Sequence, residues 1–350
     1  MAAISQHPAG KLAGGLLPSW APYAAFLGSW AAVAAVEAAL GIFTVALSLL
    51  FGVIVALIVT YAWSRAVESP RRAFDRTMTL LIASAFALAM IPLASLIFEV
   101  VKRGIPGISL EFFTESARGK ISGGGAQHAI VGTLVITGVA VLISVPIGLM
   151  AAIYMNEYGT GRLRRALTFF VDVMTGIPSI VAGLFAYALF EIFFGPGIRL
   201  GVMGSVALSV LMIPIVIRSA EEVLKIVPNH LREAAYALGT PKWKTITKIV
   251  LPTAFAGLVT GVMIATARII GETAPLLVTT GVVDSLNTDP FNGRMQNLAV
   301  YAYNEYRSPG VMKQASYDRA WAAALVLIAI VMILNVAARF VYRRYKTEIR

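Results

Sequence analysis

The segment AIVGTLVITGVAVLISVPIGLMAAIYM, residues 129–155, contains no Asp, Glu, Lys or Arg. A helix needs about 20 predominantly apolar residues to cross a membrane, so this segment is long enough for one crossing. The rest of the chain has the same character, because 58% of its 350 residues are hydrophobic and only 13% are charged. A soluble domain has about 25% charged residues, and one globular core cannot hide this apolar excess. The sequence therefore predicts an all-α polytopic membrane protein.

The apolar segments are sufficient for eight crossings. Residues 21–63 carry a single charge, Glu37, and have about twice the length of one span, so we expect two helices with a tight turn near residues 37–41. An alternative merges residues 21–63 into one tilted helix, which gives seven spans and an outside N-terminus. The other predicted spans cover residues 78–101, 129–155, 166–194, 201–217, 254–280 and 320–342.

The positive charges indicate the orientation in the membrane. Of the 29 Lys and Arg residues, 19 lie in alternate loops and in the terminal segments, at Lys11 and in residues 65–76, 162–165, 218–248 and 339–350. By the positive-inside rule this side is cytoplasmic, and both termini are predicted to lie inside. Because basic residues bracket apolar spans, the net charge of +11 reflects membrane topology, and no nucleic acid partner is predicted. The chain has no cysteine and three scattered histidines, so no disulfide or metal site is predicted.

The cytoplasmic connection at residues 218–252 has the pattern of a helix, a sharp turn and a second helix. Gly239 supplies a left-handed stop, and Thr240 is predicted to cap the second helix with Pro241 at its first position. An exposed amphipathic helix either lies on the lipid interface or docks in a groove of another protein, and periodicity leaves both open. Its apolar stripe, at spacings of three and four, consists of Leu231, Ala234, Ala235 and Leu238.

Seven positions in this connection match a known signature. The EAA motif is reproduced by Glu233, Ala234, Ala235, Gly239, Ile249, Leu251 and Pro252, and in this the chain resembles the inner-membrane permeases of ABC importers. The stretches LREAAYALGTPKWKTI at residues 231–246 and ARIIGETAPLL at residues 267–277 are similar to the PstA-type permease of phosphate ABC importers. This likeness begins near residue 78 and includes IYMNEYG at residues 153–159, PSIVAGLF at residues 178–185 and PIVIRSAEEVLKIVP at residues 214–228.

The resemblance implies a fold and a domain organisation. It implies a six-helix type I ABC importer permease core at residues 78–342, with the EAA coupling loop at residues 218–252. Residues 21–77 add a transmembrane hairpin and linker, about two helices more than that core contains. Cytoplasmic tails are expected at residues 1–20 and 343–350.

The resemblance also implies a function, that of a permease subunit forming half of the pathway of an ATP-driven, binding-protein-dependent inorganic phosphate importer. The chain has no GxxxxGK[ST] loop, so it is not expected to be an enzyme or to bind a cofactor, and ATP and Mg would belong to a partner ATPase. The implied partners are the lipid bilayer, a second homologous permease (PstC-type), an ATPase dimer (PstB-type) and an extracytoplasmic phosphate-binding protein (PstS-type). The implied location is the cytoplasmic (inner) membrane. Two alternatives are a permease for another oxyanion or solute and, from another class, an ion-coupled secondary transporter.

The coupling residues follow from the same resemblance. In that family the EAA helix is the coupling element that inserts into the ATPase subunit, and Gly239 would make the bend that presents it. The alternative is an ordinary helical hairpin between spans. The residues assigned to ATPase coupling are Leu231, Glu233, Ala234, Ala235, Leu238 and Gly239.

Two charged residues lie inside a predicted span. Arg268 and Glu272 are four residues apart, so on a helix they share a face and could pair with each other. A charge at the bilayer centre costs about 2.5–3.5 kcal/mol on insertion scales and persists where it has a partner or faces a pathway. A guanidinium offers five fixed N–H donors, which suits a tetrahedral oxyanion. We therefore expect Arg268 to line the phosphate path with Glu272 holding it; the alternative is a structural salt bridge.

A second charged set lies where spans meet the cytoplasm. Arg218 and Glu221 are three residues apart, and their RSAE stretch resembles the RTTE stretch of the PstA family, where such charges are thought to matter for transport. Asp172 could accept a hydrogen bond from Arg218 or Arg268. Because interfacial charges snorkel cheaply, the alternatives are a topological role for the pair and an interfacial cap for Asp172.

Glycine and proline residues predict the shape of two spans. Gly176, Pro178 and Ser179 interrupt the span at residues 166–194, and such breaks are tolerated beside cavities, so Ser179 is a further pathway candidate. Gly257 and Gly261 form a GxxxG face that permits close approach of another helix, in a partner or in the same chain.

Overall fold

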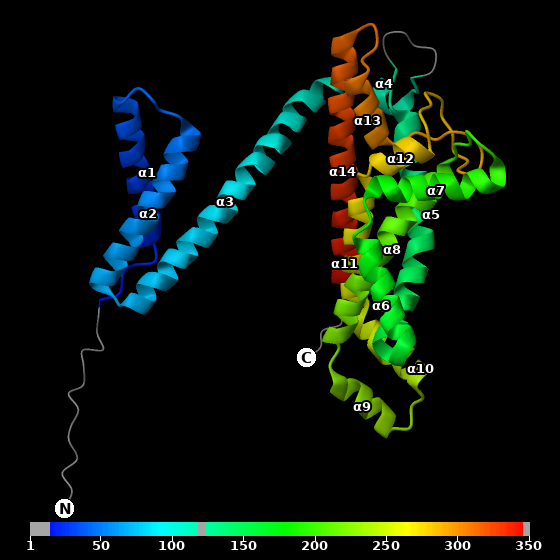
Figure 1. The fold of residues 1–350 in the computed structure, drawn as a ribbon, viewed down its shortest axis with the longest axis horizontal. Coiled ribbons are helices and arrows are strands. Elements are labelled where there is room, and N and C mark those ends of the chain that lie inside the picture. Colours follow the sequence, from blue (N-terminus) through cyan, green and yellow to red (C-terminus); the bar gives the residue numbers. More distant parts are fainter. Residues whose placement is uncertain (1–14, 118–123, 346–350) are drawn as a thin grey trace, which may run out of the picture. The chain divides into compact units, whose positions relative to one another are not determined.

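The computed structural model describes residues 15–117 and 124–345. Within these residues every regular element is a helix and no strand occurs (Figure 1), so the all-α prediction is confirmed. Most of the two predicted cytoplasmic tails, residues 1–14 and 346–350, lies outside the described part.

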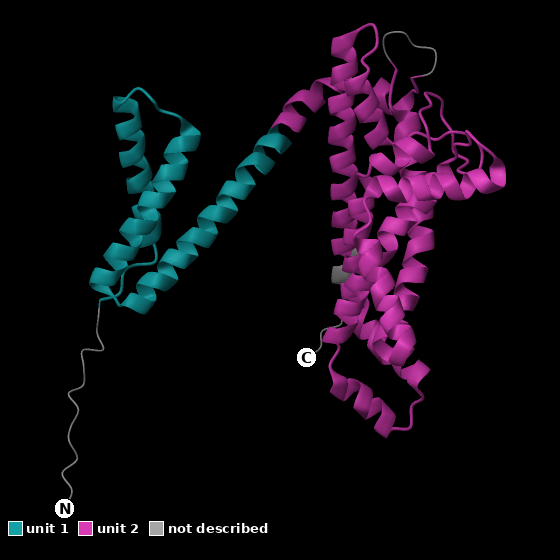
Figure 2. Cartoon of the chain, in the orientation of Figure 1, with its two compact units in different colours: residues 1–98 teal, residues 99–350 magenta. Residues whose placement is uncertain are grey.

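The chain divides into two compact units (Figure 2). Unit 1 is Met1–Phe98 and unit 2 is Glu99–Arg350. The division falls inside helix α3, which spans Pro70–Gly104. Residues 77 and 78, on either side of the predicted domain boundary, both lie within this helix.

Unit 1 contains a helical hairpin followed by most of α3. Helix α1 spans Ala21–Ala39 and helix α2 spans Val45–Val67. Gly41 lies in the turn with φ of +70°, a conformation that glycine adopts without steric cost. The helices approach closely, since a Cβ on Gly52 would lie 3.0 Å from the Cα of Trp30. Residues 21–63 thus contain two helices joined by a turn, as expected, and the single tilted helix is wrong. That both helices cross the membrane stays a prediction.

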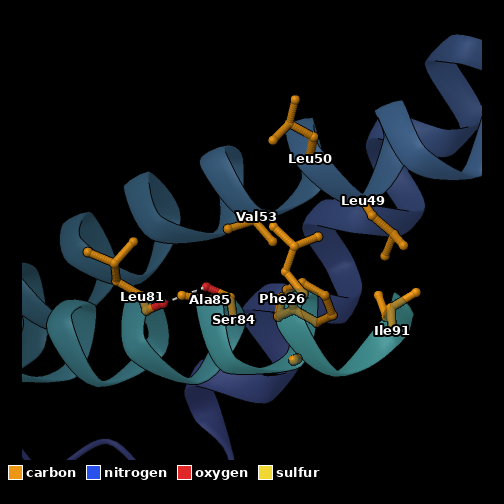
Figure 3. Close-up of a pocket in the computed structure, with 10 residues that line it drawn as sticks. Phe26, Leu49, Leu50, Val53, Leu81, Ser84, Ala85 and Ile91 are labelled. Carbon is orange, nitrogen blue, oxygen red and sulfur yellow. Dashed lines mark hydrogen bonds between the residues drawn. The ribbon is translucent and has the colours of Figure 1, made fainter. Parts of the chain in front are cut away.

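An apolar groove of about 230 Å³ lies among the three helices of unit 1 (Figure 3). Its walls include Phe26 of α1, Val53 of α2 and Ile91 of α3. The hydroxyl of Ser84, which also lines it, donates to the carbonyl of Leu81 at 3.0 Å. That hydroxyl is therefore already satisfied within its own helix, and the groove presents hydrocarbon.

A buried carboxylate fixes the junction between α2 and α3. Glu68 accepts hydrogen bonds from the Ser64 hydroxyl at 2.6 Å, the Arg76 guanidinium at 2.8 Å and the backbone N–H of Leu17 at 2.9 Å. Burial raises the pKa of the Glu68 carboxyl, but these hydrogen bonds and the Arg76 charge outweigh it, so the net pKa lies below the usual 4.5. The junction is therefore strongest with Glu68 ionised.

Unit 2 consists of long helices joined by short ones. The long helices are α5 (Gln127–Ile153), α6 (Gly161–Thr175), α7 (Ser179–Phe194), α8 (Gly201–Ile226), α11 (Leu251–Ile270) and α14 (Lys313–Tyr345). The shorter helices are η1 (Ile105–Gly107), α4 (Leu110–Thr114), η2 (Tyr154–Tyr158), α9 (Asn229–Ala237), α10 (Lys242–Thr245), η3 (Ile246–Val250), α12 (Ala274–Thr279) and α13 (Leu298–Arg307).

Six helical segments of the described part are long and apolar enough to cross a membrane, or up to seven if the bent pair α6 and α7 is counted as one span. Both counts are below the eight expected, because α1 is in neither and the bent pair is only in the second. Helix α1 is rich in alanine, which is less apolar than leucine or valine, and it carries Glu37. The six are Val45–Val67, Pro70–Gly107, Gln127–Tyr158, Gly201–Ile226, Lys242–Ile270 and Lys313–Phe340.

Two predicted spans are broken. Helices α6 and α7 meet at an angle of 108°, which confirms that Gly176 and Pro178 interrupt residues 166–194. The predicted span at residues 254–280 is also broken, since α11 ends at Ile270 and α12 starts at Ala274.

Small residues allow the helices of unit 2 to pack closely. The hydroxyl of Ser205 in α8 donates to the carbonyl of Ile136 in α5 at 2.9 Å, and a Cβ on Gly148 of α5 would lie 2.7 Å from the Val216 side chain. A Cβ on Gly261 would lie 2.7 Å from the Ser219 Cβ. The GxxxG face of α11 thus packs on α8 of the same chain. Such contacts hold helices together in lipid, where the hydrophobic effect contributes little to helix association.

Candidate functional site

Helix α9 ends as the sequence predicts. Gly239 has φ of +72°. The Thr240 N–H donates to the Ala235 carbonyl at 3.0 Å, and the Gly239 N–H donates to the Tyr236 carbonyl at 2.9 Å. These two bonds are the Schellman arrangement, which satisfies the last carbonyls of a helix and places a glycine in the left-handed region.

The start of the next helix differs from the prediction by one residue. Helix α10 begins at Lys242, and Pro241 stands before it with an extended ψ of 151°. The Pro241 carbonyl accepts the first helical bonds from Lys244 and Thr245, at 3.0 and 3.1 Å. Pro241 is therefore the N-cap, and the expectation that Thr240 caps the helix is wrong.

The predicted apolar stripe of α9 is divided between two environments. Ala235 is 3% exposed, and Leu231 packs on the core cluster that contains Leu224 and Val250. Leu238 is 85% exposed, and Glu233 and Ala234 are also exposed. We call residues 229–245 the α9–α10 element. One side of this element packs on the core of unit 2, and the other side is exposed. Its outward apolar side chains are Tyr236, Leu238 and Trp243.

An arginine that sequence reasoning missed holds this element in place. The Arg232 guanidinium lies 2.8 Å from a Glu157 oxygen of η2, and it donates to the carbonyls of Val227 and Leu224 at 2.7 and 3.1 Å. The Arg232 and Glu157 side chains are only 12% and 5% exposed. The available signal was opposite charge in two of the stretches that carry the resemblance, IYMNEYG and LREAAYALG.

A charge cluster joins α6 to α8. Arg218 donates to Glu221 at 2.9 Å and also pairs with Asp172 of α6, so Asp172 has Arg218 as its partner. Lys225, for which no ion pair was predicted, lies 2.8 Å from the other Glu221 oxygen. We call Asp172, Arg218, Glu221 and Lys225 the Arg218 cluster.

Arg268 and Glu272 do not form the expected pair. Helix α11 ends at Ile270 with Gly271 as its C-cap, so Glu272 lies in the bend that follows and is not on the helix face of Arg268. Within the described residues no ion pair joins the two, and none joins Arg268 to the Arg218 cluster. Arg268 is exposed on the surface of the single chain, whereas Glu272 is half-buried.

Ser179 lies at the bend where α7 begins, directly after Pro178. Helix α7 then packs on α12, and a Cβ on Gly183 would lie 2.6 Å from the Cα of Pro275. The two broken spans therefore meet. Ser179 stands at the start of α7, and Arg268 stands near the end of α11, the helix that precedes α12 in the chain.

Comparison with known proteins gives the family. A family model described as "Binding-protein-dependent transport system inner membrane component" matches residues 144–350. The phosphate transport system permease protein PstA 1 of Mycobacterium tuberculosis (strain CDC 1551 / Oshkosh) is 44% identical over 281 residues, covering 78% of this chain and 91% of that protein. PstA of Pasteurella multocida (strain Pm70) is 37% identical over 275 residues, covering 78% and 95%.

Solved structures show the same fold at low sequence identity. The alginate ABC transporter bound to an alginate pentasaccharide-loaded periplasmic protein matches with a TM-score of 0.54 and 16% identity, covering 78% of this chain and 96% of that chain. The inward-facing MetNI methionine ABC transporter matches with a TM-score of 0.50 and 21% identity, covering 62% and 94%. With the EAA signature on the helical loop of α9 and α10, the family model and the PstA relatives identify the chain as a member of the PstA family of phosphate transport system permeases, within the binding-protein-dependent transport system inner membrane components.

Proposed function

We propose that the chain is the permease subunit of an ATP-driven, binding-protein-dependent importer of inorganic phosphate and forms half of its translocation pathway. The observation that carries this proposal is identity of 37–44% to PstA permeases over nearly their whole length. The proposed location is the inner membrane, with both termini in the cytoplasm. The proposed partners are a PstC-type permease, a PstB-type ATPase dimer that binds ATP and Mg, and a PstS-type phosphate-binding protein.

The α9–α10 element suits contact with the ATPase. Tyr236, Leu238 and Trp243 give it an exposed apolar side, and an amphipathic helix of this kind docks in the groove of a partner protein. Arg232 ties the same element to α8 and η2, so motion imposed on α9 is passed to the membrane helices. Glu233 and Ala234 are exposed and available to the partner.

The charged residues divide into two roles. The Arg218 cluster locks α6 to α8 near the α9–α10 element, and such a lock can change partners when the pathway alternates between its two sides. Arg268 is exposed and has no ion-pair partner within the described residues. In the assembled transporter it faces the pathway, where its fixed donors bind the oxygens of phosphate.

Uptake into proteoliposomes that contain the complete transporter tests this function. Radiolabelled phosphate should enter only with ATP inside and loaded binding protein outside, and Arg268→Gln should abolish uptake while the complex still assembles. Arg307→Gln removes an exposed guanidinium that packs on Tyr303 at the other end of the unit, so it is the matched control. Uptake of sulfate in place of phosphate would contradict the proposal that phosphate is the substrate. Uptake driven by a proton gradient without ATP would contradict the assignment to the ATP-driven importers.

A further inference from the structure

A pocket of about 660 Å³ is lined by residues from the C-terminal turn of α3, from α13 and from the start of α14. In Figure 1 these segments meet at the end of unit 2 that is remote from α9. The proposed function does not use this pocket. Two apolar segments long enough to cross a membrane terminate there, Pro70–Gly107 and Lys313–Phe340, as is expected at a membrane interface. The side chains that define it are Lys102, Arg103, Tyr306, Tyr317, Asp318 and Trp321.

The charged residues of the pocket lining differ in whether they are paired. Arg103 pairs with Glu99 and lies over the Trp321 ring, 5.3 Å from its centroid. The Asp318 carboxylate accepts a hydrogen bond from the Gln314 amide at 2.8 Å. Lys102 is exposed and has no ion-pair partner in the part of the chain that the structure describes. The pocket lining therefore carries two cations, Lys102 and Arg103, and one carboxylate, Asp318, so its charge is net positive.

The other walls are aromatic and apolar. The Tyr306 ring lies 5.4 Å from the Tyr317 ring and 6.4 Å from the Trp321 ring. Tyr and Trp are enriched where hydrocarbon meets the headgroup layer, because each has an apolar body and a polar tip. Val101 and Ile105, beside the pocket on α3 and η1, are exposed apolar residues. The Lys102 ammonium beside aromatic and aliphatic surface suits an amphiphile better than a hydrated free anion.

We propose that this pocket binds the headgroup of an anionic phospholipid from the leaflet opposite the α9–α10 element, with the phosphodiester at Lys102. The aromatic side chains contact the glycerol region, and Val101 and Ile105 contact the first part of an acyl chain. The lipid thereby covers the junction between α3 and α14, where a Cβ on Gly104 would lie 2.9 Å from the Leu325 Cβ.

Photocrosslinking of the intact transporter tests the site. The complex is placed in phosphatidylcholine nanodiscs with a photoreactive phosphatidylglycerol, and labelled peptides are mapped by mass spectrometry. Labelling should concentrate on residues 99–107 and 313–321. Lys102→Gln should lower the affinity for the probe about fivefold, since a basic residue near a membrane surface contributes about 1 kcal/mol. Arg307→Gln, the same charge loss on α13 outside the pocket, should leave labelling unchanged.

Three results would overturn the proposal. Equal labelling of both variants would show that Lys102 does not recognise the lipid. Displacement of the probe by millimolar inorganic phosphate would make this an anion site, and displacement by the purified binding protein would make it a protein-docking surface.

Discussion

Replacement of Arg232 should uncouple the α9–α10 element from the membrane helices. Arg232→Met keeps most of the side-chain length but removes every hydrogen bond of the guanidinium. It leaves the carbonyls of Val227 and Leu224 without that donor, and it leaves the Glu157 carboxylate, 5% exposed, without its cation. The uncompensated charge is the main cost.

The magnitude follows from this geometry. Breaking a buried ion pair by removing one partner costs about 3–5 kcal/mol. Glu157 keeps one hydrogen bond, from the Asn156 side-chain amide at 2.8 Å, so we expect the lower end, about 3 kcal/mol. At about 1.4 kcal/mol for each factor of ten, this shifts the docking equilibrium of α9 by about 100-fold. Arg232→Met combined with Glu157→Met should recover much of that loss, because neither charge then stays buried.

Two assays in the complete transporter measure the effect of the Arg232 replacement. Hydrogen exchange of residues 229–238 reports the docking of α9, and ATP-dependent phosphate uptake reports coupling. The matched control is Lys248→Met, which removes an exposed charge in the same loop. If Arg232→Met leaves both the exchange protection of α9 and uptake at control values, the proposed mechanical link through Arg232 is wrong. If the double replacement is as damaging as the sum of the two single ones, the buried charge is not the cause.

Gly239→Ala should destabilise the end of α9 by about 1 kcal/mol, because φ of +72° suits glycine, and faster hydrogen exchange at residues 235–240 would show it. The α2–α3 junction should weaken in acid. The folded pKa of Glu68 is lowered, so its contribution is complete above the unfolded value of 4.5 and is lost as pH falls through the folded value. Hydrogen exchange of residues 64–76 between pH 3 and 7 tests this, and Glu68→Gln should remove the dependence. Gly261→Leu should lower the melting temperature by overpacking α11 against α8, whereas Gly138→Leu, with no atom within 4 Å, should not; equal Tm values would refute the packing argument.

The sequence predicted those features that depend on local chemistry. Apolar runs predict membrane helices because each span satisfies its own backbone hydrogen bonds. Gly239 predicts a helix stop because its left-handed φ is a property of one residue. The break at Gly176 and Pro178 is predictable because proline lacks a backbone N–H and its ring clashes with the preceding turn of a helix. The family could be inferred from the EAA motif because that motif is a contiguous pattern.

The pairings of the charged side chains were not predictable in the same way. Arg268 and Glu272 have the spacing of two residues on one helix face, but α11 ends between them. The bend that follows removes Glu272 from that face. Asp172 had two possible arginine partners, and only the packing of α6 on α8 selects Arg218. Arg232 and Glu157 lie on segments separated by three helices.

The sequence by itself therefore determined that the chain is an all-helical membrane protein of the ABC importer permease class with an EAA loop. The tertiary structure decided which charges meet, which side of α9 is anchored by Arg232 and which side is left for a partner. The physical reason is that hydropathy, caps and turns act over a few residues. An ion pair or a close helix contact instead requires two distant segments to be held within a few ångströms of each other.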